Sequence, residues 1–239
     1  MRTRLRFLLV VCTGGVLAFA SAMRATPEAA ERLASDAQDA FVAQDFPKAL
    51  ALLTKAIAEN PSDYTLYGNR GSCYDNLGQT TEALHDFDTS LQKAIERTKD
   101  PKDQRLAPIL FNRGQLYVHA GLSKEAIADF EKTLAIDDDF PNARLELSWT
   151  LATSVDPAVR NPKKALELVL EDIKRNGANG ANSADTLAAA QAVNGNFTEA
   201  VKQEKDALSQ ARNILEKKNY TERLRLYEAG KPYLQKSEK

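Results

Sequence analysis

The sequence has little of several features that mark specialised classes of protein. It contains only 11 glycines and 9 prolines in 239 residues, which excludes a collagen-like chain, and two cysteines, which are too few for a disulfide-rich fold. Positive and negative side chains nearly balance, with 32 Lys and Arg against 33 Asp and Glu. No excess of positive charge is therefore available to neutralise a run of phosphates, and we expect no nucleic-acid partner. The 43% of hydrophobic residues is enough for a folded core.

The first 22 residues are expected to be an export signal. Three arginines precede a mostly apolar stretch at 7–20, and the small residues Ala20-Ser21-Ala22 follow it. The stretch is shorter than the roughly 17–25 residues that a membrane-spanning helix needs. We expect cleavage after Ala22 and delivery to the bacterial periplasm or cell envelope, with no membrane span after cleavage. Cleavage after Ala20 and retention as an anchor are the alternatives.

Cleavage would change both the charge and the cysteine content. It removes three positive charges and leaves a net charge of −4, and it removes Cys12 as well. Cys73 then has no partner within the chain, so an intramolecular disulfide cannot form. The exported protein is expected to depend on packing for its stability.

A pattern of residues recurs along the chain at fixed spacings. A first set is repeated 43 positions later: Tyr67, Gly71, Tyr74, Ala83 and Phe87 recur as Leu110, Gly114, Tyr117, Ala126 and Phe130. A similar set lies 34 positions before the first: Leu33, Ala37, Ala40, Ala49 and Leu53. Two degenerate copies follow, one around Ser148 and Ala165 and one around Ala188 and Ala200. The chain is therefore expected to repeat one structural unit about five times.

Each unit contains two amphipathic stretches of helical length that are separated by a turn such as 77–80. This arrangement predicts a pair of antiparallel helices. Gly71 and Ala83 fall where the two helices cross closely, and Tyr74 and Phe87 would fill the space beside that crossing. One pair cannot bury both of its faces, so the pairs are expected to stack.

These spacings resemble the tetratricopeptide repeat family, and the segment from Leu147 to Tyr233 resembles a degenerate terminal module of exported bacterial members. The resemblance implies an all-α fold, a right-handed solenoid of about five helix-turn-helix pairs with a capping helix near Tyr220–Ala229. The units are expected at 30–63, 64–97, 107–140, 141–175 and 181–214, with a lead-in at 23–29, an exposed connecting insertion at 98–106, and the capping helix and tail at 215–233. The fourth unit has five extra residues in its inter-helix loop, with Pro162 in the first turn of the next helix.

Few residues favour catalysis, a metal or a cofactor. His85 and His119 have no second histidine at helical spacing and no neighbouring cysteine, so we expect both to be solvated. Asp137-Asp138-Asp139 lacks the ligand spacing of a calcium loop and is expected to end one helix and cap the next before Pro141. Cys73 is expected to be an inert packing residue. We predict no catalytic, metal or cofactor site and no enzymatic activity.

The resemblance implies that the protein binds a peptide or helix of a partner protein in the concave groove lined by the first helices. The candidate groove residues are Phe41, Asn69, Asp75, Asn76, Phe111, Asn112, Gln115, Val118, His119 and Trp149. Phe111 and Trp149 are expected to be anchors that the core does not need. The alternative is that the C-terminal helix, or the loop after Thr153, covers them.

Two other functions remain open, a structural subunit of an envelope complex and a periplasmic co-chaperone. The chaperone-binding members of the family grip a C-terminal carboxylate with basic residues. Ala34, Gln38, Pro108 and Asn112 stand at those positions here. The sequence therefore does not predict that type of recognition, and the oligomeric state is left open.

Overall fold

The computed structural model describes residues 27–178 and 180–235, and its regular elements there are helices. In order, they are α1 (Pro27–Val42), α2 (Phe46–Glu59), α3 (Tyr64–Asn76), α4 (Thr80–Thr98), the short 3₁₀ helix η1 (Gln104–Leu106), α5 (Ala107–His119), α6 (Ser123–Ile136), α7 (Ala143–Thr153), α8 (Pro162–Asn176), α9 (Gly180–Val193), α10 (Phe197–Ser209) and α11 (Ile214–Glu228). The predicted signal peptide lies outside the described residues.

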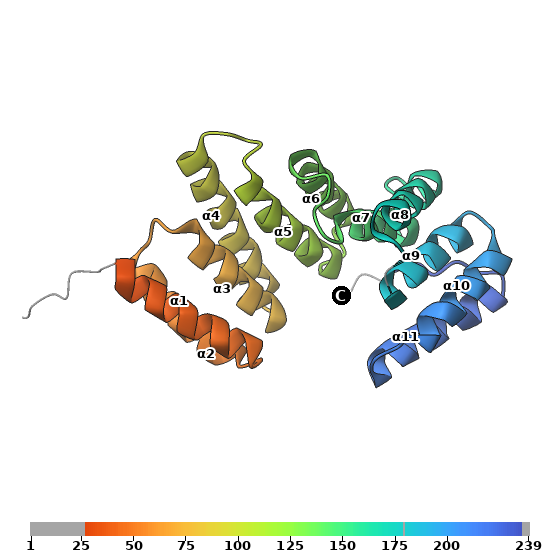
Figure 1. Cartoon of the computed structure of the whole chain (residues 1–239), viewed down its shortest axis with the longest axis horizontal. Helices are drawn as coiled ribbons and strands as arrows, with labels where there is room; N and C mark the ends of the chain where they lie inside the picture. The colour runs from red at the N-terminus through yellow and green to blue at the C-terminus, as the bar shows by residue number, and fades with distance from the viewer. Residues whose placement is uncertain (1–26, 179, 236–239) are drawn as a thin grey trace, which may run out of the picture.

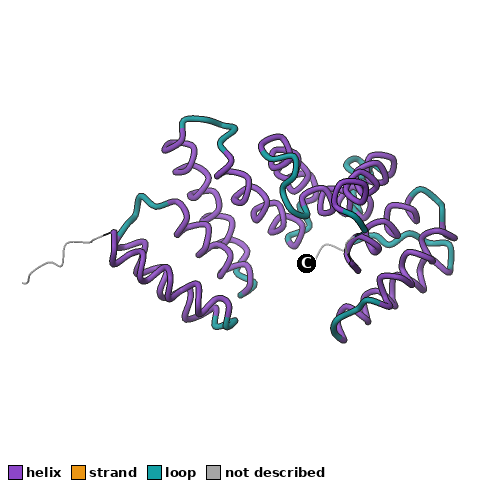
Figure 2. The backbone as a smooth tube through the Cα atoms, in the orientation of Figure 1, coloured by secondary structure: helices purple, strands orange, loops and turns teal. Residues whose placement is uncertain are grey.

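Successive helices pack as pairs, α1 with α2 through α9 with α10, and α11 packs on α10. Figure 1 shows the pairs stacked into an arch, with α1 and α2 at one end and α10 and α11 at the other. Mostly short loops connect the helices (Figure 2). The prediction of an all-α solenoid of five helix pairs with a capping helix is confirmed.

Small residues allow the two helices of each pair to approach closely. The alanine that marks the crossing is fully buried in all five pairs: Ala49, Ala83, Ala126, Ala165 and Ala200. A Cβ atom at Gly71 would lie 3.3 Å from the carbonyl oxygen of Ala83, and one at Gly114 would lie 2.7 Å from the ring of Phe130. Packing therefore explains why glycine stands at both positions, because neither leaves room for a side chain.

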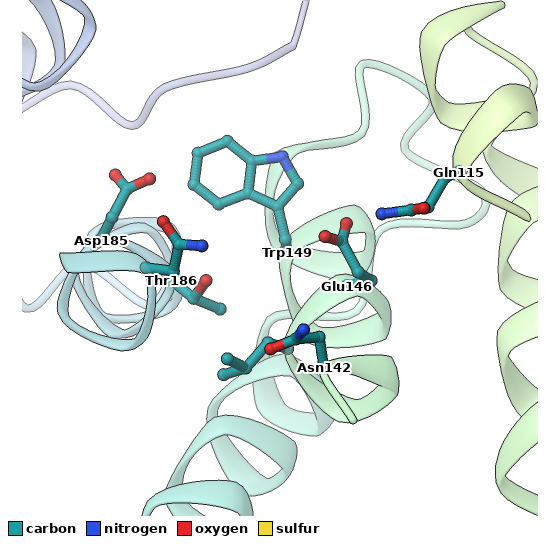
Figure 3. Close-up of a pocket in the computed structure, with 8 residues that line it drawn as sticks. Gln115, Asn142, Glu146, Trp149, Asp185 and Thr186 are labelled. Atoms are coloured by element: carbon teal, nitrogen blue, oxygen red, sulfur yellow. The ribbon is translucent and has the colours of Figure 1, made fainter. Parts of the chain in front are cut away.

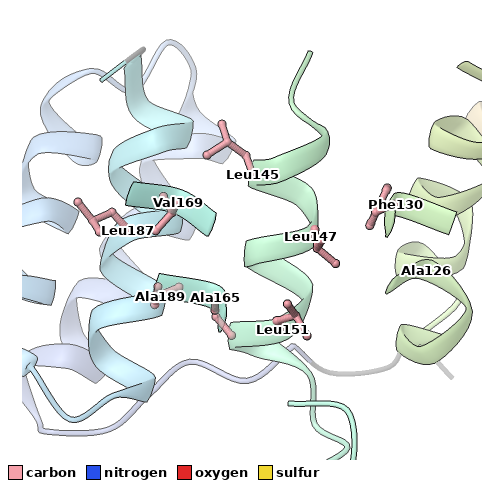
Figure 4. Packing of buried hydrophobic residues seen from close by; sticks show 11 residues of the cluster. Ala126, Phe130, Leu145, Leu147, Leu151, Ala165, Val169, Leu187 and Ala189 are labelled. Carbon is pink, nitrogen blue, oxygen red and sulfur yellow. The ribbon is translucent and has the colours of Figure 1, made fainter. Parts of the chain in front are cut away.

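The largest buried cluster joins the third, fourth and fifth pairs. Phe130 from α6, Leu147 from α7 and Val169 from α8 all belong to it. In Figure 4, α7 lies between α6 and the helices α8 and α9, and Leu147 points toward Phe130. This cluster holds α7 in place, and α7 carries part of the candidate site.

Three local details differ from the sequence-based expectations. The capping helix begins at Ile214 and not near Tyr220, because the side chain of Asn213 caps its first turn. Leu106, expected in an exposed connection, is buried against Ile109 and Leu110. In the acidic triplet, Asp137 ends α6 but no aspartate caps α7.

The other two aspartates of this triplet, Asp138 and Asp139, bind arginines instead. Asp138 accepts hydrogen bonds from Arg144 and Arg175, and Asp139 accepts one of 3.1 Å from Arg175. The helix α7 starts only at Ala143, after Asn142 has adopted a left-handed backbone conformation with φ of 63°. The expected position of Pro162 is confirmed, since it opens α8 and Asn161 caps the same turn.

Candidate partner-binding groove

The candidate groove residues all lie on the first helices of their pairs. They are Phe41 on α1; Asn69, Asp75 and Asn76 on α3; Phe111, Asn112, Gln115, Val118 and His119 on α5; and Trp149 on α7. Asn69, Asn76 and His119 are exposed and the others are half-buried. His119 approaches Asp75 with 3.4 Å between Nδ1 and Oδ1, which links α5 to α3. The structure thus distributes these residues along four neighbouring helices.

Some of these residues line two pockets. A small one of about 90 Å³, the α1–α3 pocket, is lined by Ala34, Ala37, Gln38, Phe41, Leu53, Asn69 and Ser72. A larger one of about 350 Å³, the α7–α9 pocket, is lined by Gln115, Asn142, Leu145, Glu146, Trp149, Asn182, Asp185 and Thr186. The other six candidates, Asp75, Asn76, Phe111, Asn112, Val118 and His119, line neither of these pockets.

The α7–α9 pocket combines one aromatic wall with polar side chains. Figure 3 shows Trp149 between the carboxylates of Glu146 and Asp185, with Gln115 extending toward Glu146 from α5. Sequence reasoning found Trp149 and Gln115 but missed the two acids. Glu146 was within reach of that reasoning, because it lies three positions before Trp149 and therefore on the same helix face.

Glu146 is held in a poorly solvated position. Burial raises the pKa of its carboxyl group, while a hydrogen bond with Gln115 and the charge of His119 act in the opposite direction. No lysine or arginine is among the residues that line the pocket. The carboxylate of Glu146 therefore forms an acidic wall without a basic neighbour in the lining.

Asp185 is paired with an arginine from the last helix. Arg223 of α11 donates two hydrogen bonds to its carboxylate, of 2.7 and 3.0 Å, and lies 3.4 Å from the carboxylate of Glu204 on α10. Glu204 is fully buried, and burial, followed by the nearby charge of Asp185, raises its pKa to about 9. One arginine thus serves two buried acids, and Glu204 is a neutral carboxylic acid at pH 7.

Trp149 also contacts the C-terminal part of the chain. The guanidinium carbon of Arg223 lies 5.2 Å from its ring centre, and the ring of Tyr233 lies 5.9 Å away. Beyond Tyr233, the amide of Gln235 donates a 2.7 Å hydrogen bond to the carbonyl oxygen of Thr153. The C-terminal segment therefore covers Trp149 in part, as the alternative expectation proposed, and leaves it as a wall of the pocket.

Phe111 is also more internal than expected. Its ring packs 5.7 Å from that of Phe130 and 5.1 Å from that of Phe140, and it belongs to the rim of the largest core cluster. The expectation that the core does not need Phe111 and Trp149 is wrong, because both side chains pack against the largest core cluster. Residues that line pockets at this surface also support the fold.

The described residues contain no group of three or more His, Cys, Asp and Glu placed to hold a metal ion. His85 is exposed, and Cys73 is buried with its thiol pKa raised to about 11 by desolvation. Such a thiol is protonated and a poor nucleophile at neutral pH. Within 27–178 and 180–235, no helix is both long enough and apolar enough to cross a membrane.

Comparison with known proteins agrees with the helix pairs. Residues 63–139, which contain α3 to α6, match the tetratricopeptide repeat family. Residues 63–139 are tetratricopeptide repeats. The matched residues are those whose repeat spacing was most regular in the sequence, and the tetratricopeptide fold continues on both sides of them.

Similar proteins extend this relation over different lengths. The Hsp70-Hsp90 organizing protein of Triticum aestivum is 32% identical over 66 residues, which is 28% of this chain and 11% of that protein. This chain therefore spans about a tenth of that relative. A tetratricopeptide repeat protein from Parabacteroides merdae matches 85% of this chain and 75% of its own with a TM-score of 0.64 at 19% identity. YrrB, described as a tetratricopeptide protein with an unusual peptide-binding site, matches 86% of this chain and 98% of its own with a TM-score of 0.58 at 18% identity.

Proposed function

We propose that this tetratricopeptide repeat protein is a scaffold that binds a peptide or helix of a partner protein along its first helices. The observation that carries the proposal is the placement of the two pockets. The α1–α3 pocket and the α7–α9 pocket are lined almost entirely by α1, α3, α5, α7 and α9. Both therefore belong to the row of helices that forms one continuous surface of the solenoid.

The chemistry of this surface suits an extended segment. Asn69 and Gln115 present amide groups that both donate and accept hydrogen bonds, as a peptide backbone requires. Phe41 and Trp149 give the two pockets an aromatic wall each, and aromatic side chains are common anchors at protein interfaces. YrrB, which shares the fold, is described as having a peptide-binding site.

The proposal includes export to the periplasm or cell envelope, on the evidence of the arginines, the apolar stretch 7–20 and the small residues that end it. Intact-mass measurement of the protein in the envelope fraction is expected to give a chain that begins at Met23. Recovery of the full-length chain from the cytoplasm alone would remove this part of the proposal.

Site-specific photo-crosslinking tests where the partner binds. A benzoylphenylalanine is placed in turn at Asn69 and Gln115 on the first helices, and at the exposed Leu170 on α8 as the matched control. Crosslinks from both groove positions to one segment of the same partner, with none from position 170, are expected. Crosslinks from position 170 alone would show that the partner binds elsewhere.

A second candidate function is assembly into an envelope complex through the C-terminal end. Ile214 and Leu215 at the start of α11 are 88% and 66% exposed, and adjacent exposed apolar side chains at the end of a solenoid are typical of contact surfaces. A crosslinker at Leu215 distinguishes this function, because only assembly through the end predicts products from that position.

We do not propose carboxylate recognition of the chaperone-binding type. The likeness to the organizing protein of wheat is confined to 66 residues, and Ala34 and Gln38 occupy the α1–α3 pocket where basic residues would be needed. A co-chaperone role would therefore depend on a different contact. The crosslinked segment of the partner tests this, because a C-terminal carboxylate would be its expected end.

A further inference from the structure

We propose that the α7–α9 pocket binds the cationic side chain of a lysine or arginine of the partner segment. The inference rests on the proposed function, because it assigns a chemical preference to one part of the same surface. Its basis is the combination of an enclosed space, two carboxylates and an indole ring.

The size of the pocket suits a single side chain. Its volume of about 350 Å³ lies at the lower end of the roughly 300–1,000 Å³ that is typical of small-ligand sites. Seven of its eight lining residues come from α7, from α9 and from the residue that precedes α7, namely Asn142, Leu145, Glu146, Trp149, Asn182, Asp185 and Thr186. The wider depression beside α11 is lined by that helix alone and encloses little.

The charges in the pocket are not balanced. Asp185 is paired with Arg223, whereas Glu146 has no lysine or arginine partner within the described residues and contacts the neutral amide of Gln115. The lining has two acids and no base. A cation entering between Gln115 and Trp149 would meet the carboxylate of Glu146 directly.

Burial makes this carboxylate a stronger partner than one on the surface. Coulomb attraction grows as the local dielectric falls, and desolvation already disfavours the ionised form of Glu146. A bound cation removes that penalty and gains a hydrogen bond. Two charges that meet in this way form a charge-assisted bond, which is about twice as strong as a neutral one.

Trp149 adds a second source of attraction. Indole is the best aromatic partner for a cation, and the chain already uses it in this way, with Arg223 at 5.2 Å from the ring centre. Asp185 holds that guanidinium in the same arrangement of acid and ring. The proposed ligand would repeat, from the side of Glu146, the contact that Arg223 makes from the side of Asp185.

A phage-displayed library of random twelve-residue peptides tests the preference on the full chain. Selection is performed on the wild type, on Glu146→Gln and on the control Glu167→Gln, which makes the same change of charge on the exposed face of α8. We expect lysine or arginine to be enriched at one position of the peptides selected by the wild type and by Glu167→Gln, and this enrichment to be lost with Glu146→Gln.

A selected peptide is then titrated against the protein while the fluorescence of Trp149, the one tryptophan of the chain, is recorded. Replacing its enriched basic residue by acetyl-lysine is expected to weaken binding at least tenfold, and Glu146→Gln is expected to weaken it by a similar factor. Glu167→Gln should change it less than twofold. Circular dichroism of each variant confirms that the fold is retained.

Three results would overturn the inference. The first is a set of selected peptides without a preference for lysine or arginine, and the second is an affinity that Glu146→Gln leaves unchanged. Either result would show that the pocket does not select a cationic side chain, while the proposed function would stand. A library that yields no binding peptide would also count against it. The proposed function fails separately, when the crosslinkers at Asn69 and Gln115 give no product.

Discussion

The regular repeats at 64–140 and the terminal region at 141–235 bury their charges in different ways. In the regular repeats, an arginine of the first helix binds an aspartate of the second helix 16 positions later. Arg70 donates to Asp86 at 2.6 and 2.8 Å, and Arg113 donates to Asp129 at 2.7 and 2.8 Å. In the terminal region, Arg223 comes from α11 and serves acids on both α9 and α10.

The difference shows which helix pairs supply both members of their buried ion pair. Each regular pair brings one arginine and one aspartate of its own, so the same contact can recur with the repeat. The last pair contains Asp185 and Glu204 but takes its arginine from the helix that follows. The helix α11 is therefore required to pair the buried carboxylate of Asp185 with a cation, in addition to covering the apolar surface at the end of the solenoid.

The largest expected effect is that of Arg223→Ala. It leaves the carboxylate of Asp185 buried without a cation, and it removes the contacts of Arg223 with Glu204 and Trp149. Breaking a buried pair in this way costs roughly 3–5 kcal/mol. Urea unfolding, followed by the fluorescence of Trp149, is expected to shift to much lower urea concentration.

Two variants serve as controls for this prediction. Arg225→Ala changes an exposed arginine on the same helix and should shift the transition little. Arg70→Ala breaks an ion pair with Asp86 alone and should cost less than Arg223→Ala, which also removes the contacts with Glu204 and Trp149. An equal loss for Arg70→Ala and Arg223→Ala would remove the distinction between the two regions.

The next effect concerns the helix crossing on which the regular repeats depend. Ala126→Leu inserts a larger side chain at a fully buried position beside Phe130 and should cost about 1–3 kcal/mol. Ala128→Leu places the same side chain on the exposed face of α6 and should have little effect. Thermal unfolding followed by circular dichroism measures both, and equal melting temperatures would show that the repeat register is wrongly assigned.

A smaller effect is expected from Glu204→Gln, and it depends on pH. The folded state keeps the proton of Glu204 up to about pH 9, whereas the unfolded state releases it near the ordinary value of 4.5. The free energy of unfolding of the wild type therefore falls as pH rises between these two values. Glutamine does not titrate, so the stability of the variant relative to the wild type should rise by roughly 1 kcal/mol between about pH 6 and about pH 7. A constant difference across that range would show that Glu204 is ionised in the fold.

The contrast between the two regions also explains why the helix pairs could be predicted from the sequence more fully than the candidate site. The helix pairs follow from small residues at fixed spacing, since Gly71, Gly114 and the five buried alanines each lie where a larger side chain would not fit. The same spacing relates Arg70 to Arg113 and Asp86 to Asp129, so these ion pairs were within reach of the sequence although they were not identified.

The candidate site was less predictable, because its partners follow no repeat. Arg223 and Asp185 are separated by 38 positions, and the ion pairs of residues 27–178 and 180–235 contain no second pair at that spacing to reveal it. The α7–α9 pocket depends on how α5, α7 and α9 are placed after the extended loop between Thr153 and Pro162. The sequence placed Trp149 on the groove side, but its contact with Tyr233 requires the path of the C-terminal segment.

The smallest expected effect lies at the border between the two regions. Lys164 on α8 donates a 2.6 Å hydrogen bond to Glu131 on α6, across the boundary of the third and fourth pairs. Both side chains are more than 40% exposed, so water and salt screen the pair, and Lys164→Ala should cost less than about 0.5 kcal/mol. The apolar contacts of Phe130, Leu147 and Val169 would then carry the coupling between the regions. Chemical unfolding at low and high salt measures this, and a loss larger than that of Ala126→Leu would show that the border is held by charge and not by packing.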